Sequence, residues 1–188
     1  MAGVSILDVD ALLASLVRKA PETIPFLEVR ASPLLEREIT IEGMLEYLGP
    51  GQLTRNVTAP YVERTVIDGD VVRVRREGRP ERTFFLGRAP GLGGFLAGLA
   101  AILSGDRATL EREFEISLTG TTDDWQLTLV PHSREVRERV DRIRLRGAYD
   151  SARCIVTVSA DGATASELVL GGAVAAAGSA EQRARHCN

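Results

Sequence analysis

Residues 38–48 read Glu-Ile-Thr-Ile-Glu-Gly-Met-Leu-Glu-Tyr-Leu, and the prediction of the fold starts from this segment. Apolar side chains alternate along it with polar ones, which predicts a β-strand with one buried face and one exposed face. Gly43 interrupts the apolar face and indicates a bulge or a bend. At eleven residues the strand is about twice the usual length, so its sheet must close or wrap around another element. The apolar face carries Ile39, Ile41, Leu45 and Tyr47.

Further strand patterns follow this one, and the connections between them are mostly short. Residues 62–67 and 70–76 join through Asp68-Gly69, which is among the strongest hairpin signals. Nine or ten strands with short connections favour an antiparallel sheet, because parallel pairs need long crossovers. We therefore predict a mainly β (α+β) fold built on one large curved sheet. The other strands are predicted at residues 53–57, 81–86, 114–119, 125–130, 142–146, 153–159 and 165–170.

An amphipathic helix is predicted before the sheet. Its apolar positions recur at helical spacing, and Asp8 is placed to cap its N-terminus. The helix should end near Ala20, because Pro21 disfavours helical backbone in the residue before it. A single apolar stripe means that the helix packs on the core rather than inside it. The stripe consists of Val9, Leu12, Leu13, Leu16 and Val17.

Residues 89–103 are predicted to form a second and unusual helical segment. They read Ala-Pro-Gly-Leu-Gly-Gly-Phe-Leu-Ala-Gly-Leu-Ala-Ala-Ile-Leu and carry no charge. An uncharged helix is normally buried on all sides, so its partner should be the apolar face of the sheet. Two interpretations stay open: a core helix whose glycines allow close packing, or a weakly held lid that an apolar ligand displaces.

The composition is that of a globular domain without a nucleic-acid surface. The chain has 188 residues, a net charge of -3 and 44% hydrophobic residues, which fits one domain and argues against nucleic acid as a partner. We expect the domain at residues 1–170, and an Ala/Gly-rich tail or a loosely held helix at residues 171–188. No apolar run reaches the roughly 18–20 residues that span a bilayer. Residues 1–4 lack the features of a secretory signal, so the chain is either cytosolic or has lost a signal.

Few side chains suit catalysis or metal binding. Cys154 and Cys187 make neither a disulfide framework nor a zinc site, and Cys187 is expected to have no chemical role. An esterase or acyltransferase would need His132 beside a serine or a carboxylate, and no Gly-x-Ser-x-Gly motif accompanies that histidine. We therefore predict no enzymatic activity, no metal and no cofactor.

Three arginines share one face of a predicted strand, with apolar residues between them. Arg142, Arg144 and Arg146 alternate with Ile143 and Leu145. The first interpretation is a solvated outer face of the sheet that neighbouring acidic residues partly neutralise. The second is a site for phosphate or anionic lipid head groups, which arginine binds through two parallel hydrogen bonds.

A series of short motifs carries a resemblance to a known family. Gly43-Met44-Leu45-Glu46-Tyr47-Leu48-Gly49-Pro50 precedes Leu53-Thr54-Arg55, Ala59-Pro60 and Val66-Ile67-Asp68-Gly69-Asp70. This order resembles the periplasmic outer-membrane lipoprotein carrier (LolA-like) superfamily. In that superfamily a Gly-x-Leu-x-x-x-Arg-Pro strand precedes an aromatic strand and an Asp-Gly hairpin.

The resemblance is strongest over residues 36–76 and looser over residues 6–170. It also contains departures, because the arginine that precedes proline in the family falls on Gly49 of this chain. The tryptophans of the family's following strands fall on Arg55 and Arg73. The chain therefore looks like a divergent member of the superfamily.

The resemblance implies an open antiparallel half-barrel, with the N-terminal helix and lid helices over an apolar concave face. Its cavity would shield acyl chains, and the protein would be a periplasmic carrier that moves a lipid or lipoprotein toward the outer membrane. The implied partners are the acylated cargo, an inner-membrane exporter and an outer-membrane acceptor, with no stable membrane insertion and a monomeric state. The alternative is an interaction domain of the same fold that docks an exporter and has a filled interior. The expected cavity and lid residues are Ile41, Leu45, Tyr47, Leu53, Phe84, Leu92, Phe95, Leu96, Leu99, Ile102, Leu103 and Trp125.

Overall fold

Eleven antiparallel strands form one open sheet in the part of the chain that the computed structural model describes, which is residues 8–31, 37–85, 98 and 100–187. The strand order is β6-β5-β4-β3-β2-β1-β11-β10-β9-β8-β7. The predicted mainly β fold with an open antiparallel sheet is confirmed. The strands are β1 (Glu22–Arg30), β2 (Ile39–Gly49), β3 (Gln52–Ala59), β4 (Glu63–Asp68), β5 (Val71–Arg76), β6 (Arg82–Phe85), β7 (Phe114–Thr121), β8 (Asp124–Pro131), β9 (Val140–Ala148), β10 (Ser151–Ser159) and β11 (Thr164–Leu170).

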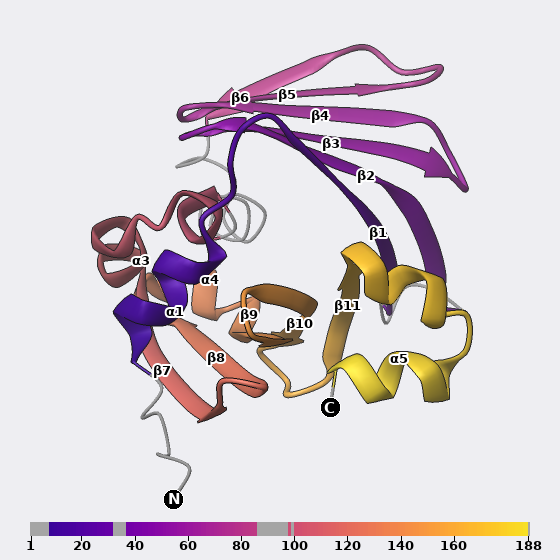
Figure 1. The fold of residues 1–188 in the computed structure, drawn as a ribbon. Coiled ribbons are helices and arrows are strands. Elements are labelled where there is room, and N and C mark those ends of the chain that lie inside the picture. Colours follow the sequence, from indigo (N-terminus) through magenta and orange to yellow (C-terminus); the bar gives the residue numbers. More distant parts are fainter. Residues whose placement is uncertain (1–7, 32–36, 86–97, 99, 188) are drawn as a thin grey trace, which may run out of the picture.

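The sheet bends into a trough with helices on both sides (Figure 1). The helices α1 (Val9–Leu16) and α3 (Arg107–Glu113) lie on the concave side, and the helical residues 100–104 bury Ala101, Ile102 and Leu103 in the same core. The 3₁₀ helix η2 (Gly171–Ala176) and α5 (Ala180–Cys187) lie on the other side of β11. A short helix, α4 (Arg134–Arg137), connects β8 to β9.

The first helix begins as the sequence predicts and ends earlier. The Asp8 carboxylate caps α1 by accepting a hydrogen bond from the Ala11 backbone N–H at 3.3 Å. Helical backbone ends at Leu16, because Val17 has left the helical conformation, with a φ of -55° and a ψ of 127°. The Arg18 backbone N–H then donates to the Leu103 carbonyl at 3.0 Å, which ties the end of α1 to the helical residues 100–104.

The predicted irregularity at Gly43 is present, and the extra residue lies on the neighbouring strand. Glu42 of β2 pairs with Ala59 and Gly43 pairs with Val57, so Thr58 of β3 has no partner and forms a bulge opposite β2. A Cβ atom at position 43 would lie 1.9 Å from the Asn56 carbonyl oxygen and 2.9 Å from the Phe26 ring. Glycine is therefore required here, because β3 and β1 approach the backbone too closely for any side chain.

The strand β1 was not predicted, although it occupies the middle of the sheet. It pairs with β2 on one side and with β11 on the other, so the first and last strands meet. Pro25 lies within it, and the next four residues, 26–29, are all buried. That pattern lacks alternation because the core covers one face of β1 while η2 packs against the strand.

Two apolar cores lie on opposite faces of the sheet. The larger one fills the concave side and joins α1, the trough walls and α3. The smaller one lies on the convex side, where residues of β10 and β11 meet the C-terminal segment 171–187. The members of the convex core are Cys154, Val156, Val158, Val169, Ala177 and Cys187.

The cap of α3 gives a pH-dependent prediction. The Asp106 carboxylate accepts hydrogen bonds from the Thr109 hydroxyl at 2.6 Å and the Thr109 backbone N–H at 3.0 Å. These bonds, the hydroxyl one first, lower the pKa of Asp106 below its ordinary value of 3.8. Asp106→Ala should therefore decrease the unfolding free energy by about 1 kcal/mol near neutral pH, as removal of an N-cap does.

The stabilisation by Asp106 depends on its ionised form, which is favoured in the folded chain. It is fully present above the unfolded-state pKa and is lost as pH falls through the lower folded-state pKa. Urea unfolding of wild type and Asp106→Ala from about pH 7 to about pH 2 should show the difference shrinking. Asp106→Asn, which keeps a cap without a titrating group, is the control. A difference that stays constant with pH would contradict the assignment.

Candidate functional site

A cavity of about 660 Å³ opens where β11 passes into η2. Its volume lies within the roughly 300–1,000 Å³ that is common for small-molecule sites. The end of α1, the helical residues 100–104, and the strands β1, β9, β10 and β11 contribute its walls. Apolar side chains make the inner walls, namely Leu16, Ile24, Ile102, Leu103, Leu145, Ile155 and Leu170.

Side chains with polar groups gather at the rim of this cavity. Arg18 and Glu22 form an ion pair at 3.8 Å, and the Arg18 guanidinium also donates to the Asp150 carbonyl. Arg153 and His186 line the cavity from β10 and α5. The site thus combines an apolar interior with a charged opening, an arrangement that suits an amphiphilic ligand.

The predicted site residues divide into four groups. Ile102 and Leu103 line the cavity. Phe84 is half-buried and packs against the concave core. Leu92, Phe95, Leu96 and Leu99 lie outside the described residues. The remaining five do not line this cavity and are buried in the concave core, with at most 3% of each residue exposed: Ile41, Leu45, Tyr47, Leu53 and Trp125.

Several cavity residues were treated as ordinary core positions in the sequence. Leu145 alternates with the arginines of β9, and Ile155 lies in the predicted strand at 153–159. Leu16 belongs to the apolar stripe of α1. Periodicity identified the buried face in each case. The periodicity did not show which residues of the buried face line a cavity.

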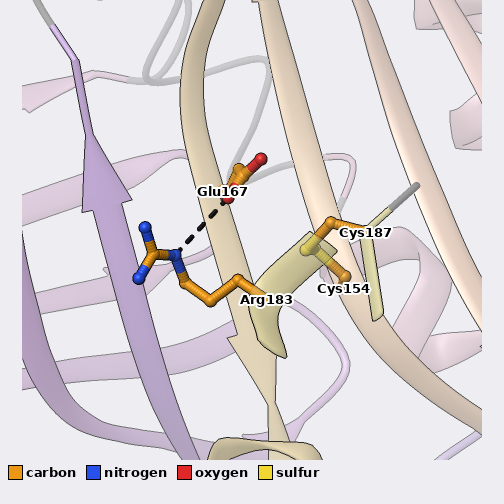
Figure 2. The surroundings of a disulfide bond; sticks show 4 residues. All are labelled: Cys154, Glu167, Arg183 and Cys187. Carbon is orange, nitrogen blue, oxygen red and sulfur yellow. Dashed lines mark ion pairs between the residues drawn. A yellow bond between two sulfur atoms is a disulfide. The ribbon is translucent and has the colours of Figure 1, made fainter. Parts of the chain in front are cut away.

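The C-terminal segment is fixed to the sheet by a disulfide bond. Cys154 on β10 and Cys187 on α5 are bonded, with a Cα–Cα distance of 5.2 Å (Figure 2). The expectation that Cys187 has no chemical role is therefore wrong. Arg183 of α5 adds an ion pair to Glu167 of β11 at 3.6 Å. Residues 171–187 are thus held firmly on the convex face, and the expectation of a loosely held helix is also wrong.

A buried ion cluster lies on the concave face at the other end of β1. The Glu28 carboxylate, with only 8% of its side chain exposed, accepts hydrogen bonds from Arg55 at 2.6 Å and from Arg30 at 2.8 Å. Arg55 also stacks over the Phe26 ring at 4.7 Å and lies 3.9 Å from Glu63. Burial alone would lower the pKa of the Arg30 guanidinium, but the charge and hydrogen bonds of Glu28 raise that pKa above its usual value.

His132 makes a structural contact. Its Nε2 atom lies 3.2 Å from the Glu111 carbonyl oxygen, and its backbone N–H donates to Glu113, so it joins the end of β8 to α3. Within the described ranges no group of three or more His, Cys, Asp or Glu side chains is arranged to hold a metal ion. None of the helices in that part of the chain is long and apolar enough to cross a bilayer.

The chain matches a family model and is distantly similar to solved structures. The family model described as "Outer membrane lipoprotein carrier protein LolA-like" matches residues 1–188. A LolA superfamily protein from Nitrosomonas europaea is 13% identical, with a TM-score of 0.43 over 86% of this chain and 89% of that one. A chain of the Pseudomonas aeruginosa MucA/MucB complex is 15% identical, with a TM-score of 0.43 over 93% of this chain and 58% of that one. No protein with a curated description matches the sequence.

Proposed function

Since this chain belongs to the outer membrane lipoprotein carrier protein LolA-like family, we propose that it is a carrier that shields an acyl chain in the cavity beside α1. The apolar inner walls of that cavity are the observation that carries the proposal. Burial stabilises each methylene by about 0.8 kcal/mol, so a long chain needs no polar contact inside to bind well. The protein then works by binding and release, without a catalytic step.

The proposed cargo is a lipid or lipoprotein, moved toward the outer membrane between an exporter and an acceptor. The Cys154–Cys187 disulfide supports an oxidising compartment, because such bonds persist in the periplasm and are rare in the cytosol. We therefore propose a periplasmic location. Between the two membranes an acyl chain would be exposed to water, and the cavity would shield it during transfer.

Native mass spectrometry of the delipidated protein tests the proposal. After incubation with a total lipid extract, we expect the folded chain to retain about one acylated species per molecule, since the cavity volume fits one small ligand. Incubation with palmitate should also raise the unfolding temperature, because a ligand that binds only the folded state stabilises it. Absence of any bound species, together with an unchanged unfolding temperature, would refute the carrier role.

A second candidate function is an interaction domain with a filled interior. The deep burial of Leu45, Leu53 and Trp125 favours it, because these side chains already fill the concave face beside the cavity. Such a domain would bind a partner protein such as an exporter and would have no acyl ligand. The unfolding temperature with and without palmitate distinguishes the two functions, because only a carrier is stabilised by the fatty acid.

A further inference from the structure

We infer that the rim of the cavity binds an anionic head group, so that the cargo is an amphiphile with a carboxylate or phosphate at one end of its acyl chain. The inference rests on the proposed carrier function and specifies the chemical class of its ligand. It depends on two side chains with hydrogen-bonding nitrogen atoms, the guanidinium of Arg153 and the imidazole of His186, that the fold brings to one opening.

A β-bulge places Arg153 at the rim. The β9–β10 register shifts between Ala152 and Cys154: Ala152 pairs with Gly147, and Cys154 pairs with Arg146. Arg153 is the extra residue of this bulge and has no partner opposite it. Bulges redirect side chains and occur often beside functional sites. Here the bulge lets both Ala152 and Arg153 line the cavity, while Cys154 faces the convex core.

The disulfide brings the second of these side chains to the same place. His186 directly precedes Cys187, just as Arg153 directly precedes Cys154. The bond between the two cysteines (Figure 2) therefore fixes α5 beside the bulge, and His186 lines the same cavity as Arg153. The chain thus uses a covalent link to hold an imidazole and a guanidinium at one opening.

These two side chains have no acidic partner in the described part of the chain. The structure gives neither of them a hydrogen bond or an ion pair there, whereas Arg18 on the same rim is paired with Glu22. Glu22 is also the single carboxylate among the described residues that line the cavity. The Arg153 guanidinium therefore places a positive charge at the rim without a carboxylate partner among the described residues, next to an apolar interior.

An anionic head group satisfies both parts of this arrangement. With the acyl chain among the inner walls, the head of the ligand remains at the opening, within reach of Arg153 and His186. Arginine binds carboxylates and phosphates through strong, charge-assisted hydrogen bonds. A neutral head of the same size would offer the guanidinium only uncharged acceptors, which form weaker hydrogen bonds.

Matched ligand pairs test the inference by calorimetry with delipidated protein, at concentrations below micelle formation. One pair is palmitate and methyl palmitate; the other is palmitoyl lysophosphatidate and monopalmitoylglycerol, which lacks the phosphate. We expect the anionic member of at least one pair to bind about tenfold more tightly, the effect of one charge-assisted hydrogen bond. A preference in the first pair identifies a carboxylate ligand, and one in the second identifies a phosphate ligand.

Single variants show whether the rim is the source of the preference. Arg153→Gln and His186→Gln should each reduce it and should leave the unfolding temperature unchanged, since Arg153 is exposed and His186 is half-buried. Arg185→Gln is the matched control, because Arg185 neighbours His186 in sequence, is exposed and pairs with Glu181. This substitution removes one positive charge at a position outside the cavity, so it should leave the preference for the anionic ligand unchanged.

The outcomes separate this inference from the carrier proposal. Equal binding of both members in both pairs would overturn the anionic head group and leave the carrier role standing. A preference that survives in Arg153→Gln and His186→Gln would also overturn the inference. Failure of every ligand to bind would remove the carrier role, and the inference with it.

Discussion

Leu145→Phe is expected to weaken palmitate binding roughly 50-fold while leaving the unfolding free energy close to that of wild type. Leu145 lines the cavity from β9, so the added ring occupies space that the acyl chain needs. If the ring displaces about three methylenes at about 0.8 kcal/mol each, the loss is about 2.4 kcal/mol. Calorimetry with palmitate measures the affinity, and urea unfolding measures the stability.

Leu127→Phe is the matched control for this substitution. Leu127 lies directly opposite Leu145 on β8, is fully buried and does not line the cavity. Its site has no spare volume, so the same change should overpack the core and cost about 1–3 kcal/mol of stability. Folded Leu127→Phe should still bind palmitate. If Leu145→Phe binds like wild type and is destabilised instead, the cavity is not the acyl site.

Glu28→Ala is expected to decrease the unfolding free energy by about 3 kcal/mol, the usual cost of breaking a buried ion pair. The substitution leaves the guanidiniums of Arg30 and Arg55 close together without the carboxylate that both of them contact. Arg55 is affected most, because only 13% of its side chain is exposed to water. Urea unfolding near neutral pH measures the loss.

Two further variants identify the origin of that loss. Glu46→Ala removes a carboxylate from the neighbouring strand β2, where Glu46 is partly exposed and lies 3.9 Å from Arg64. Its effect should stay below about 1 kcal/mol, as for other surface pairs. The double variant Glu28→Leu with Arg55→Leu should recover much of the stability, because no unpaired charge stays buried. A double variant as unstable as the sum of its parts would contradict this account.

Much of the sheet could be predicted from local patterns. The alternation of residues 38–48 corresponds to β2, and the Asp68-Gly69 signal corresponds to the β4–β5 hairpin, where Gly69 has a positive φ of 60°. Gly43 marks the register shift between β2 and β3, because only glycine tolerates the close approach of the Asn56 carbonyl there. These features depend on neighbouring residues alone, so a single sequence is enough to reveal them.

The parts that were missed depend on residues far apart in the chain. β1 lacks alternation because the C-terminal segment covers the strand from its other side. The Cys154–Cys187 bond joins positions 33 residues apart, and two cysteines alone do not show that they are oxidised. The cavity lies where the curved sheet brings β9 and β10 near the end of α1, and sequence periodicity contains no measure of curvature.

The meeting of β1 and β11 in the middle of the sheet makes the fold depend on the last strand of the chain. Until β11 pairs, β1 has only β2 beside it, and its second edge stays open. Pairings between distant segments form late, because a long loop must close first. Both the β1–β11 pairing and the cavity need β11, so we expect a chain truncated before Thr164 to be unable to accept cargo.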